Sequence, residues 1–367
     1  MIDLKHREDC CGCGACAAAC PHGAILMLKD GMGFRYPAVN SELCTGCGIC
    51  NSVCAFRPVE SAGPPEASAI RFPDYLDKSQ SGGLGYALMR KAIQEGMIVY
   101  GAAIEEDFSV RHIRVTTLEG LEPLRLSKYV QSDMDGIPTM VLEDLKAGNK
   151  VLFTGTPCQC AGVGSLCGQY GENLILVDLI CHGVPAPAVW KGYLESRGRK
   201  VTKAVFRDTS LGWHDHREAL WYGRDKEVSD TFTFLFYRNI MLRPSCGECP
   251  FASTARCSDI TMGDCWGIEK AAKGLIDDDR GWSLLICSSH KGKEFVSGIE
   301  GACGKKAINL SDVRQPNLYA PTRRHPHSKC FERTFLKGGF LKADRNFGRS
   351  SLEYRLERFI KKVKRHL

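Results

Sequence analysis

The sequence contains no long apolar run and no apolar leader. Its 367 residues include no stretch of about 18 apolar residues that would span a membrane. The first ten residues, MIDLKHREDC, hold no apolar core of a signal peptide. The formal net charge of +7 is modest, and neither a basic patch interleaved with aromatic residues nor a nucleic-acid-binding motif is present. We therefore expect a cytoplasmic protein with no integral membrane segment and no nucleic-acid partner.

Low-complexity tracts and a paired G-x-G-x-x-G motif for a second dinucleotide are also missing. The chain is instead rich in cysteine, with twenty residues, and many of these have the spacing of metal ligands. A disulfide framework is therefore the weaker interpretation, and a reducing compartment suits the sequence better. Hydrophobic content of 44% and charged content of 25% are ordinary for a globular protein, and the length predicts two or three domains.

Two cysteine runs near the N-terminus organise the first part of the chain. Each reads C-x2-C-x2-C-x3-C, the spacing of two-cluster bacterial ferredoxins, in which the fourth cysteine of each run binds the other cluster. Zinc ribbons usually pair two C-x2-C units instead. Cys11 stands beside a ligand and receives no role. The pattern predicts two 4Fe–4S clusters, the first held by Cys10, Cys13, Cys16 and Cys54 and the second by Cys44, Cys47, Cys50 and Cys20.

The segments that follow each run indicate how this lobe is built and where it ends. A strand is predicted at 24–28, a turn at 31–33 and a second strand after it, as expected where two halves of a ferredoxin-like lobe join. Residues 57–69 are rich in Pro, Ala, Ser and Glu, which is typical of a linker.

A glycine-rich segment at 79–85 precedes a predicted helix. Apolar residues recur at helical spacing from Leu84 to Ala92, Gly96 ends the pattern, and a buried strand is predicted at 97–104. A glycine-rich helix start offers free N–H groups that suit phosphate, although such loops are more often plain turns.

Residues 137–185 carry the clearest α/β pattern. Short buried strands are predicted at Val151–Thr154 and Leu174–Ile180, and each ends in a loop rich in Cys, Gly and Pro. In open α/β sheets, ligands bind beyond the carboxyl ends of parallel strands, so these two ends predict a cofactor pocket. Cys158 in the first loop is either a packed thiol or a functional one, and the presence of two such loops favours function.

Downstream, the sequence predicts a helix at 190–197 and a β-rich segment at 203–237, where Thr231–Phe236 alternates apolar and polar residues. An amphipathic pattern at 351–367 predicts a terminal helix docked on the protein.

A third group of cysteines follows this segment. Cys246, Cys249 and Cys257 need a fourth ligand, and Cys181 is the candidate because it lies at a strand end. A lone C-x2-C is ambiguous between a cluster, zinc and a redox pair, so structural zinc remains the alternative.

Several of these stretches, taken together, resemble the beta subunits of coenzyme F420-reducing hydrogenase and F420-linked formate dehydrogenase. Their ordered combination is specific in a way that no single stretch is. The matching pieces are Gln80–Gly83, Ser127–Ser132, Gly155–Gln159, Ile180–Pro185, Arg207–Asp208, Arg243–Pro250 and Ser258–Gly267.

The resemblance implies a protein that binds FAD and at least one 4Fe–4S cluster and passes electrons between clusters and a hydride carrier. It implies a third cluster on Cys181, Cys246, Cys249 and Cys257, where Cys158 or Cys265 could replace a member. Lys128 and Cys158 are the candidate catalytic residues. For Lys128 the reason is that a cation near the flavin ring favours the reduced, anionic form. The implied flavin contacts are Ser81, Gly82, Gly83, Lys128, Thr154, Gly155, Thr156, Pro157, Cys158 and Gln159.

The expected fold class is α+β or α/β, with a ferredoxin-like two-cluster lobe followed by a mixed α/β flavin-binding core. The expected domains are the lobe at 1–60, the N-terminal part of the F420 hydrogenase/dehydrogenase-type core at 70–150, the C-terminal part of that core at 151–320, and a basic helical tail at 321–367.

The leading functional hypothesis is an iron–sulfur flavoprotein oxidoreductase. It would move electrons between 4Fe–4S clusters and a hydride-accepting substrate or the F420 deazaflavin by way of FAD. The expected partners are ferredoxin or another low-potential carrier, a redox partner subunit and a small-molecule substrate. The alternative is a non-catalytic, ferredoxin-like electron-transfer subunit of a larger redox complex.

Overall fold

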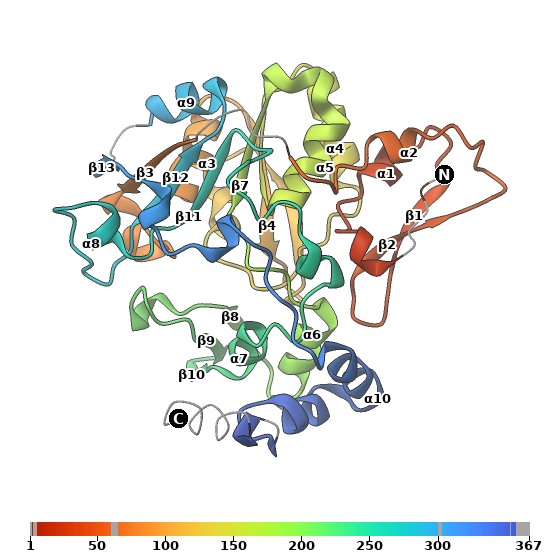
Figure 1. The fold of residues 1–367 in the computed structure, drawn as a ribbon, viewed down its shortest axis with the longest axis vertical. Helices are drawn as coiled ribbons and strands as arrows, with labels where there is room; N and C mark the ends of the chain where they lie inside the picture. The colour runs from red at the N-terminus through yellow and green to blue at the C-terminus, as the bar shows by residue number, and fades with distance from the viewer. Residues whose placement is uncertain (1, 3–5, 60–64, 300–302, 353, 357–367) are drawn as a thin grey trace.

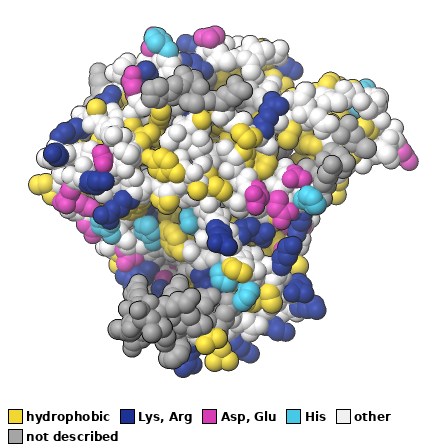
Figure 2. Space-filling model, viewed as in Figure 1, with side chains coloured by type: hydrophobic (Ala, Val, Ile, Leu, Met, Phe, Trp, Pro, Cys, Tyr) yellow, Lys and Arg dark blue, Asp and Glu magenta, His cyan; other side chains and the backbone are white. Residues whose placement is uncertain are grey.

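The computed structural model describes residues 2, 6–59, 65–299, 303–352 and 354–356. Its central feature is an eight-stranded mixed sheet, with an N-terminal lobe projecting on one side and a smaller, mostly helical part below (Figure 1). The predicted combination of a ferredoxin-like lobe and a mixed α/β core is confirmed. In the space-filling view, acidic and basic side chains are interspersed over the face shown, and no single sign of charge covers it (Figure 2).

The sheet is parallel at its centre and antiparallel at its margins. The strand order is β13-β3-β12-β11-β7-β6-β4-β5. The four adjacent strands β11, β7, β6 and β4 run parallel to one another. The two strands predicted at 151–154 and 174–180 pair in parallel, with Val151 opposite Leu174. The bounds are β3 Glu66–Arg71, β4 Ile98–Ile104, β5 Val110–Val115, β6 Val151–Gly155, β7 Leu174–Leu179, β11 Ile260–Asp264, β12 Ser283–Cys287 and β13 Cys303–Ala307.

Alternating residues of the central strands bury against helices on opposite faces of the sheet. Val99 and Leu152 pack with α3 (Leu84–Gln94), whereas Ile98 and Val151 pack with α4 (Ile137–Lys146) and α5 (Pro157–Cys167). Successive strand side chains point to opposite faces, so strands covered on both sides appear in the sequence as continuous apolar runs.

The predicted linker at 57–69 is wrong at its C-terminal end. Residues Glu66–Arg71 form β3, which lies between β12 and β13, and Ala69 and Ile70 are buried. Small alanine and serine side chains resemble linker composition, yet here they let β3 pack between its two neighbours. The part of the linker at 60–64 lies outside the described residues.

The N-terminal lobe repeats one local structure in its two cysteine runs. Helices α1 (Ala15–Ala18) and α2 (Ile49–Ser52) each start at a glycine with positive φ, Gly14 at +81° and Gly48 at +79°. A two-stranded hairpin joins the two runs, where the sequence predicted two short strands. The hairpin strands are β1 Ile25–Lys29 and β2 Arg35–Val39.

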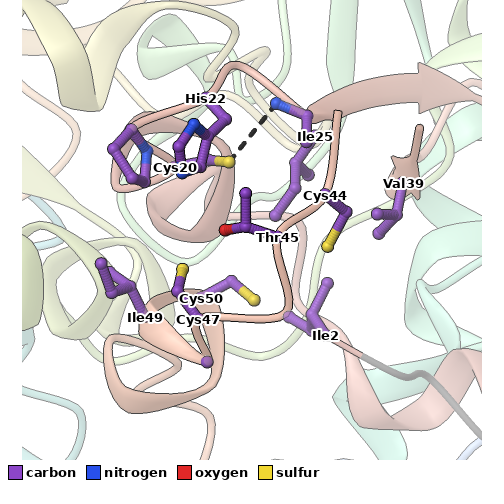
Figure 3. Close-up of a pocket in the computed structure, with 13 residues that line it drawn as sticks. Ile2, Cys20, His22, Ile25, Val39, Cys44, Thr45, Cys47, Ile49 and Cys50 are labelled. Atoms are coloured by element: carbon purple, nitrogen blue, oxygen red, sulfur yellow. Dashed lines mark hydrogen bonds between the residues drawn. The ribbon is translucent and has the colours of Figure 1, made fainter. Parts of the chain in front are cut away.

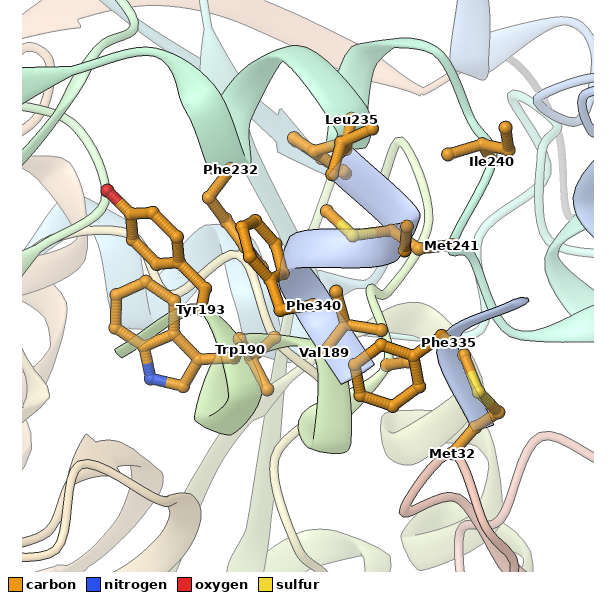
Figure 4. Close-up of a cluster of buried hydrophobic side chains, with 14 of the residues drawn as sticks. Met32, Val189, Trp190, Tyr193, Phe232, Leu235, Ile240, Met241, Phe335 and Phe340 are labelled. Atoms are coloured by element: carbon orange, nitrogen blue, oxygen red, sulfur yellow. The ribbon is translucent and has the colours of Figure 1, made fainter. Parts of the chain in front are cut away.

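The smaller part of the molecule has an aromatic core (Figure 4). Trp190 and Tyr193 of α6 meet Phe232 of α7, and Met32 from the turn of the N-terminal lobe joins the same cluster. The elements are α6 Pro187–Glu195, β8 Lys203–Val205, β9 Glu218–Tyr222, β10 Asp225–Ser229, α7 Thr231–Tyr237 and α10 Ser328–Phe347.

The strand predicted at Thr231–Phe236 is wrong, because this segment is helix α7. Phe232, Leu235 and Phe236 are buried at helical spacing. The buried carboxylate of Glu218 accepts the N–H groups of Phe232 and Thr233 and so satisfies the start of the helix. Six residues of alternation are too few to distinguish a strand from a helix when the helix start is capped from a distant strand.

The remaining elements are short or lie at the end of the chain. Among the described residues, none of the helices is both long enough and apolar enough to span a bilayer. The predicted helix at 351–367 lies largely outside the described residues. The other helices are α8 Ile268–Ala271 and α9 His290–Ser297, and short 3-10 helices occur at Arg7–Asp9, Pro73–Lys78, Glu119–Leu124, Gly168–Asn173, Thr209–Leu211, Pro244–Glu248, Leu310–Asp312 and Pro316–Leu318.

Candidate iron–sulfur and flavin site

The structure brings together the four cysteines predicted to hold the first cluster. Burial raises the pKa of Cys10, and the thiols of Cys13 and Cys54 add to that rise. The pKa of Cys16 rises to about 12, first through burial and then through the thiols of Cys13, Cys10 and Cys54. Cys54 belongs to the second run, and its thiol raises the pKa of both Cys10 and Cys16; the cross-ligation itself stays a prediction.

The four cysteines predicted for the second cluster line one pocket of the lobe (Figure 3). Cys20 comes from the first run and the other three from the second. The N–H of Ala24 donates to the Cys20 sulfur at 3.3 Å. Apolar side chains complete the lining, namely Ile2, Ile25, Val39 and Ile49. A shell of this kind limits the access of water to a cluster.

At the carboxyl edge of the sheet, Cys158 lies near three of the four cysteines predicted for the third site, Cys181, Cys246 and Cys249. Burial raises the pKa of Cys181 well above its usual value, and the thiols of Cys246, Cys158 and Cys249 add to it. The N–H of Val184 donates to the Cys246 sulfur at 3.4 Å. Cys158, in the first turn of α5, is therefore a neighbour of this group.

Cys257 and Cys265 have other contacts. The Cys257 thiol donates to the carbonyl of Pro157 at 3.4 Å, and its pKa rises to about 12 through burial and the charge of Asp178. Cys265 is fully buried in an apolar cluster beside Ile268. No three Cys, His, Asp or Glu side chains within the described ranges converge closely enough to bind a metal ion as they are placed, so all three ligand sets remain predictions.

Three residues predicted to contact flavin shape the turn between β6 and α5. Thr156 and Gln159 form a capping box, in which the side-chain oxygen of Gln159 accepts the backbone N–H of Thr156 at 2.9 Å. The Gln159 amide donates to the Ser132 hydroxyl at 2.9 Å. Pro157 occupies the first helical turn, where its missing N–H costs nothing. The Gln159 side chain thus holds two loops together.

The glycines at 82–83 are explained by packing within the protein. A Cβ atom on Gly82 would lie 2.5 Å from both the Ile70 carbonyl oxygen and the Ser283 nitrogen. Gly83, with φ of +86°, starts helix α3. The Ser81 hydroxyl donates to the Trp282 carbonyl at 2.9 Å. The local sequence therefore serves the junction of α3 with β3 and β12, and its contact with flavin stays a prediction.

Lys128 is a largely buried cation without an acidic partner among the described residues. Its ammonium donates to the Arg125 carbonyl at 2.6 Å, and burial lowers its pKa to about 7. Two residues earlier, Leu126 adopts φ of +66°, a backbone conformation that is strained for a side chain of this size. Strained backbone next to an unpaired buried cation is characteristic of ligand-binding loops.

His112 is a neighbour of Lys128 that the sequence did not identify. It is 1% exposed, its Nε2 lies 2.9 Å from the Thr154 carbonyl oxygen, and its Nδ1 is buried without a hydrogen-bond partner in the described part of the chain. Burial lowers its pKa to about 4, and the charge of Lys128 contributes. The available signal was its inward position in the alternating strand β5.

A second buried cation, Arg207, contacts Asp264 at the end of β11. Arg207 is 1% exposed and donates to the Asp264 carboxylate at 3.0 Å, and the Trp213 indole donates to the same carboxylate at 2.8 Å. Trp213 also stacks on Trp266, with ring centroids 4.3 Å apart. This group fixes the loop after β8 over the carboxyl edge of the sheet.

Comparison with known proteins assigns both halves of this arrangement. Residues 148–313 match the family model for the C terminus of the beta subunit of coenzyme F420 hydrogenase/dehydrogenase. Residues 9–57 match the model of a 4Fe-4S dicluster domain. The predicted resemblance is confirmed. The chain thus has one region similar to a 4Fe-4S dicluster domain and another similar to the C terminus of the F420 hydrogenase/dehydrogenase beta subunit.

The match to the F420 beta-subunit family includes the third cysteine group, from Cys158 to Cys257. Lys128 and the glycines at 82–83 lie outside both matched ranges. No curated protein matches the sequence. Among solved structures, the chain is similar to one in the F420-reducing [NiFe] hydrogenase complex from Methanosarcina barkeri, at 17% identity and a TM-score of 0.46, over 80% of this chain and 92% of that one.

Proposed function

We propose that this protein is an iron–sulfur flavoprotein oxidoreductase that carries electrons through its lobe to FAD in the core. The main support for this proposal is that the first and second cysteine sets have different surroundings. The first set faces the core and the third cysteine group, whereas the second set includes the exposed Cys47. Electrons would enter at the second cluster and pass through the first cluster to the core.

The contact between lobe and core is close at the first set. A Cβ atom on Gly162 of α5 would lie 2.6 Å from the Cys13 sulfur, so the glycine leaves room for that ligand. The thiol of Cys11 is 5% exposed and lies 4.0 Å from the Cys158 carbonyl oxygen. Cys158 thus stands between the first and third cysteine groups, which would place two clusters in adjacent positions.

For the third cluster, the arrangement favours Cys158 over Cys257 as the ligand that joins Cys181, Cys246 and Cys249. The thiols of these four residues influence one another, while Cys257 interacts with Asp178 and the Pro157 carbonyl. Structural zinc in this site is the alternative, because four thiolates suit either metal centre.

The FAD site is proposed at the carboxyl edge of β4 and β6, beside Lys128 and His112. Three features support it: an unpaired buried cation, a buried imidazole nitrogen without a hydrogen-bond partner, and strained backbone at Leu126. When bound, FAD supplies the step between single-electron and hydride chemistry. The protein's own contribution would be the Lys128 ammonium, which favours a reduced, anionic flavin ring.

The second candidate is a non-catalytic electron-transfer subunit in a larger redox complex. The observation that favours it is the outer surface of the lobe, where Leu43 and Ile49 are 50% and 39% exposed near the second cysteine set. Exposed apolar side chains beside an electron entry point suit a protein partner. Under either candidate we propose a cytoplasmic protein served by ferredoxin or another low-potential carrier.

Flavin and metal analysis of anaerobically purified protein tests this proposal. We expect about one FAD and about twelve irons per chain, from three 4Fe–4S clusters. Reduced ferredoxin should bleach the flavin absorbance rapidly, and NADH should do so poorly. Protein with clusters but without flavin would support the electron-transfer subunit, and about eight irons with one zinc would remove the third cluster.

A further inference from the structure

Arg243 is a buried cation at the junction of the lobe and the core. It is 1% exposed, and its guanidinium is held by oxygen acceptors from three separate segments. It donates to the Cys10 carbonyl at 2.9 Å, to the Arg35 carbonyl at 2.8 Å and to the Gln131 side-chain oxygen at 2.9 Å. Gln131 in turn donates to the Cys11 carbonyl at 2.9 Å. The pair therefore clamps the first cysteine loop from the core side.

No carboxylate in the described residues pairs with this guanidinium. Its other neighbours are the aromatic rings of Phe34 and Tyr36, at 5.3 Å and 4.3 Å from the ring centroids. Burying a charge without an opposite charge is unfavourable, so such a group normally has a compensating anion nearby. Arg35 at the same junction illustrates the usual solution, because it forms ion pairs with Asp133 and Asp135.

The available anions are the cysteine thiolates on both sides of Arg243. One guanidinium nitrogen lies 3.8 Å from the Cys10 sulfur. On the core side, the Arg243 carbonyl accepts the N–H of Cys246 at 3.0 Å, so Arg243 shares a turn with a cysteine of the third group. The second cysteine set shows no contact with Arg243 in the described structure. The charge thus lies between the first and third groups, away from the second.

We propose that Arg243 is a positioning residue that holds the first cluster against the core and raises the reduction potential of that cluster through its charge, which no carboxylate of the described residues neutralises. The inference rests on the proposed function, because it assigns the first cysteine set to a 4Fe–4S cluster. Reduction adds one electron, and so one negative charge, to a cluster. A cation at hydrogen-bond distance from a ligand therefore stabilises the reduced state more than the oxidised one.

The test is a redox titration of the purified holoprotein followed by low-temperature EPR. Arg243→Gln removes the charge, and Arg243→Lys keeps it while losing the planar fork. Gln131→Glu neutralises the charge in place, because its new carboxylate would lie against the guanidinium nitrogen that now donates at 2.9 Å. Gln131→Met removes the same contacts without adding a charge and serves as the matched control.

We expect Arg243→Gln and Gln131→Glu to lower the ratio of reduced to oxidised first cluster at a fixed potential at least tenfold, equivalent to about 59 mV for one electron. The third cluster should shift less and the second by under about threefold, which provides an internal control. Arg243→Lys and Gln131→Met should stay within about threefold of the wild type. If Arg243→Gln does not fold, Gln131→Glu and Arg243→Lys decide the question.

Equal shifts in Arg243→Lys and Arg243→Gln would indicate a purely structural clamp and overturn the inference, as would unchanged potentials in Arg243→Gln and Gln131→Glu. Failure of the proposed function has a different signature. Clusters that titrate normally but never reduce flavin would contradict the flavoprotein proposal and leave the Arg243 assignment standing. Absence of the first cluster from the wild type would overturn both.

Discussion

The two cysteine runs have the same spacing and the same local backbone, yet they occupy different environments. Helices α1 and α2 begin at equivalent glycines, and each follows the second cysteine of its run. The first set, however, contacts Arg243 and α5 of the core, while the second set lines a pocket of the lobe and includes the exposed Cys47. Spacing determines which metal centre forms, and the surroundings determine its potential and its neighbours.

The largest expected effect comes from removing one cross-ligating cysteine at a time. Cys54→Ser should eliminate the first cluster and about four of the irons, and electron delivery to the core should fall by at least about a hundredfold. Cys20→Ser should eliminate the second cluster, although Cys20 lies in the first run. Iron assays and EPR of each variant measure this. Loss of the first cluster from Cys20→Ser would show that each run holds its own cluster.

The next effect tests whether the first set has a cluster beside it in the core. Cys158→Ala should remove about four irons and slow flavin reduction by ferredoxin at least about tenfold, because Cys158 stands between the two groups. Cys257→Ala should retain the iron. Cys330→Ala in α10, an exposed cysteine, is the matched control. Loss of iron from Cys257→Ala but not from Cys158→Ala would instead support the ligand set predicted from the sequence, in which Cys257 is the fourth ligand.

The cluster ligands and the central strands could be predicted from the sequence, whereas the contacts between the lobe and the core could not. Cluster ligands lie within short runs, so their spacing is visible locally, and the parallel strands β6 and β7 appear as apolar runs. Arg243 meets the Cys10 carbonyl across 233 residues and Gln131 across 112. Such contacts arise only when distant segments pack together. For the same reason composition alone misassigned the strand β3 as a linker.

A smaller effect is expected at Lys128, at the far end of the proposed path. Lys128→Met should lower the ratio of reduced to oxidised bound flavin about tenfold at a fixed potential, about 30 mV for two electrons, whereas Lys128→Arg should keep the cation. Lys150→Met is the control, since Lys150 is exposed at the amino end of β6. A flavin potential that is unchanged in Lys128→Met would remove the role assigned to this lysine.

The same lysine predicts a pH dependence of stability in protein without flavin. Burial lowers the pKa of Lys128 from 10.5 to about 7, so between these values the unfolded chain binds more protons than the folded protein. The free energy of unfolding should therefore rise with pH across that window, and this rise should be absent from Lys128→Met. Urea titrations of both proteins at several pH values measure the difference. Parallel pH curves would show that Lys128 keeps its ordinary pKa.

The smallest effect sharpens the comparison between the two runs at a single atom. Gly12 and Gly46 are equivalent, each directly before the second cysteine of its run, with φ of +75° and +72°. A Cβ atom on Gly12 would lie 2.8 Å from the Arg243 guanidinium, whereas one on Gly46 would meet nothing within 4 Å.

Both alanine variants should therefore lose about 1–2 kcal/mol of stability from the left-handed backbone. Gly12→Ala should lose about a further 1–3 kcal/mol, because Arg243 must move away from Cys10. Denaturant unfolding of the two variants gives the difference directly. Equal losses would mean that the first loop tolerates displacement of Arg243, and the close contact between guanidinium and cysteine loop would then contribute little to holding the lobe on the core.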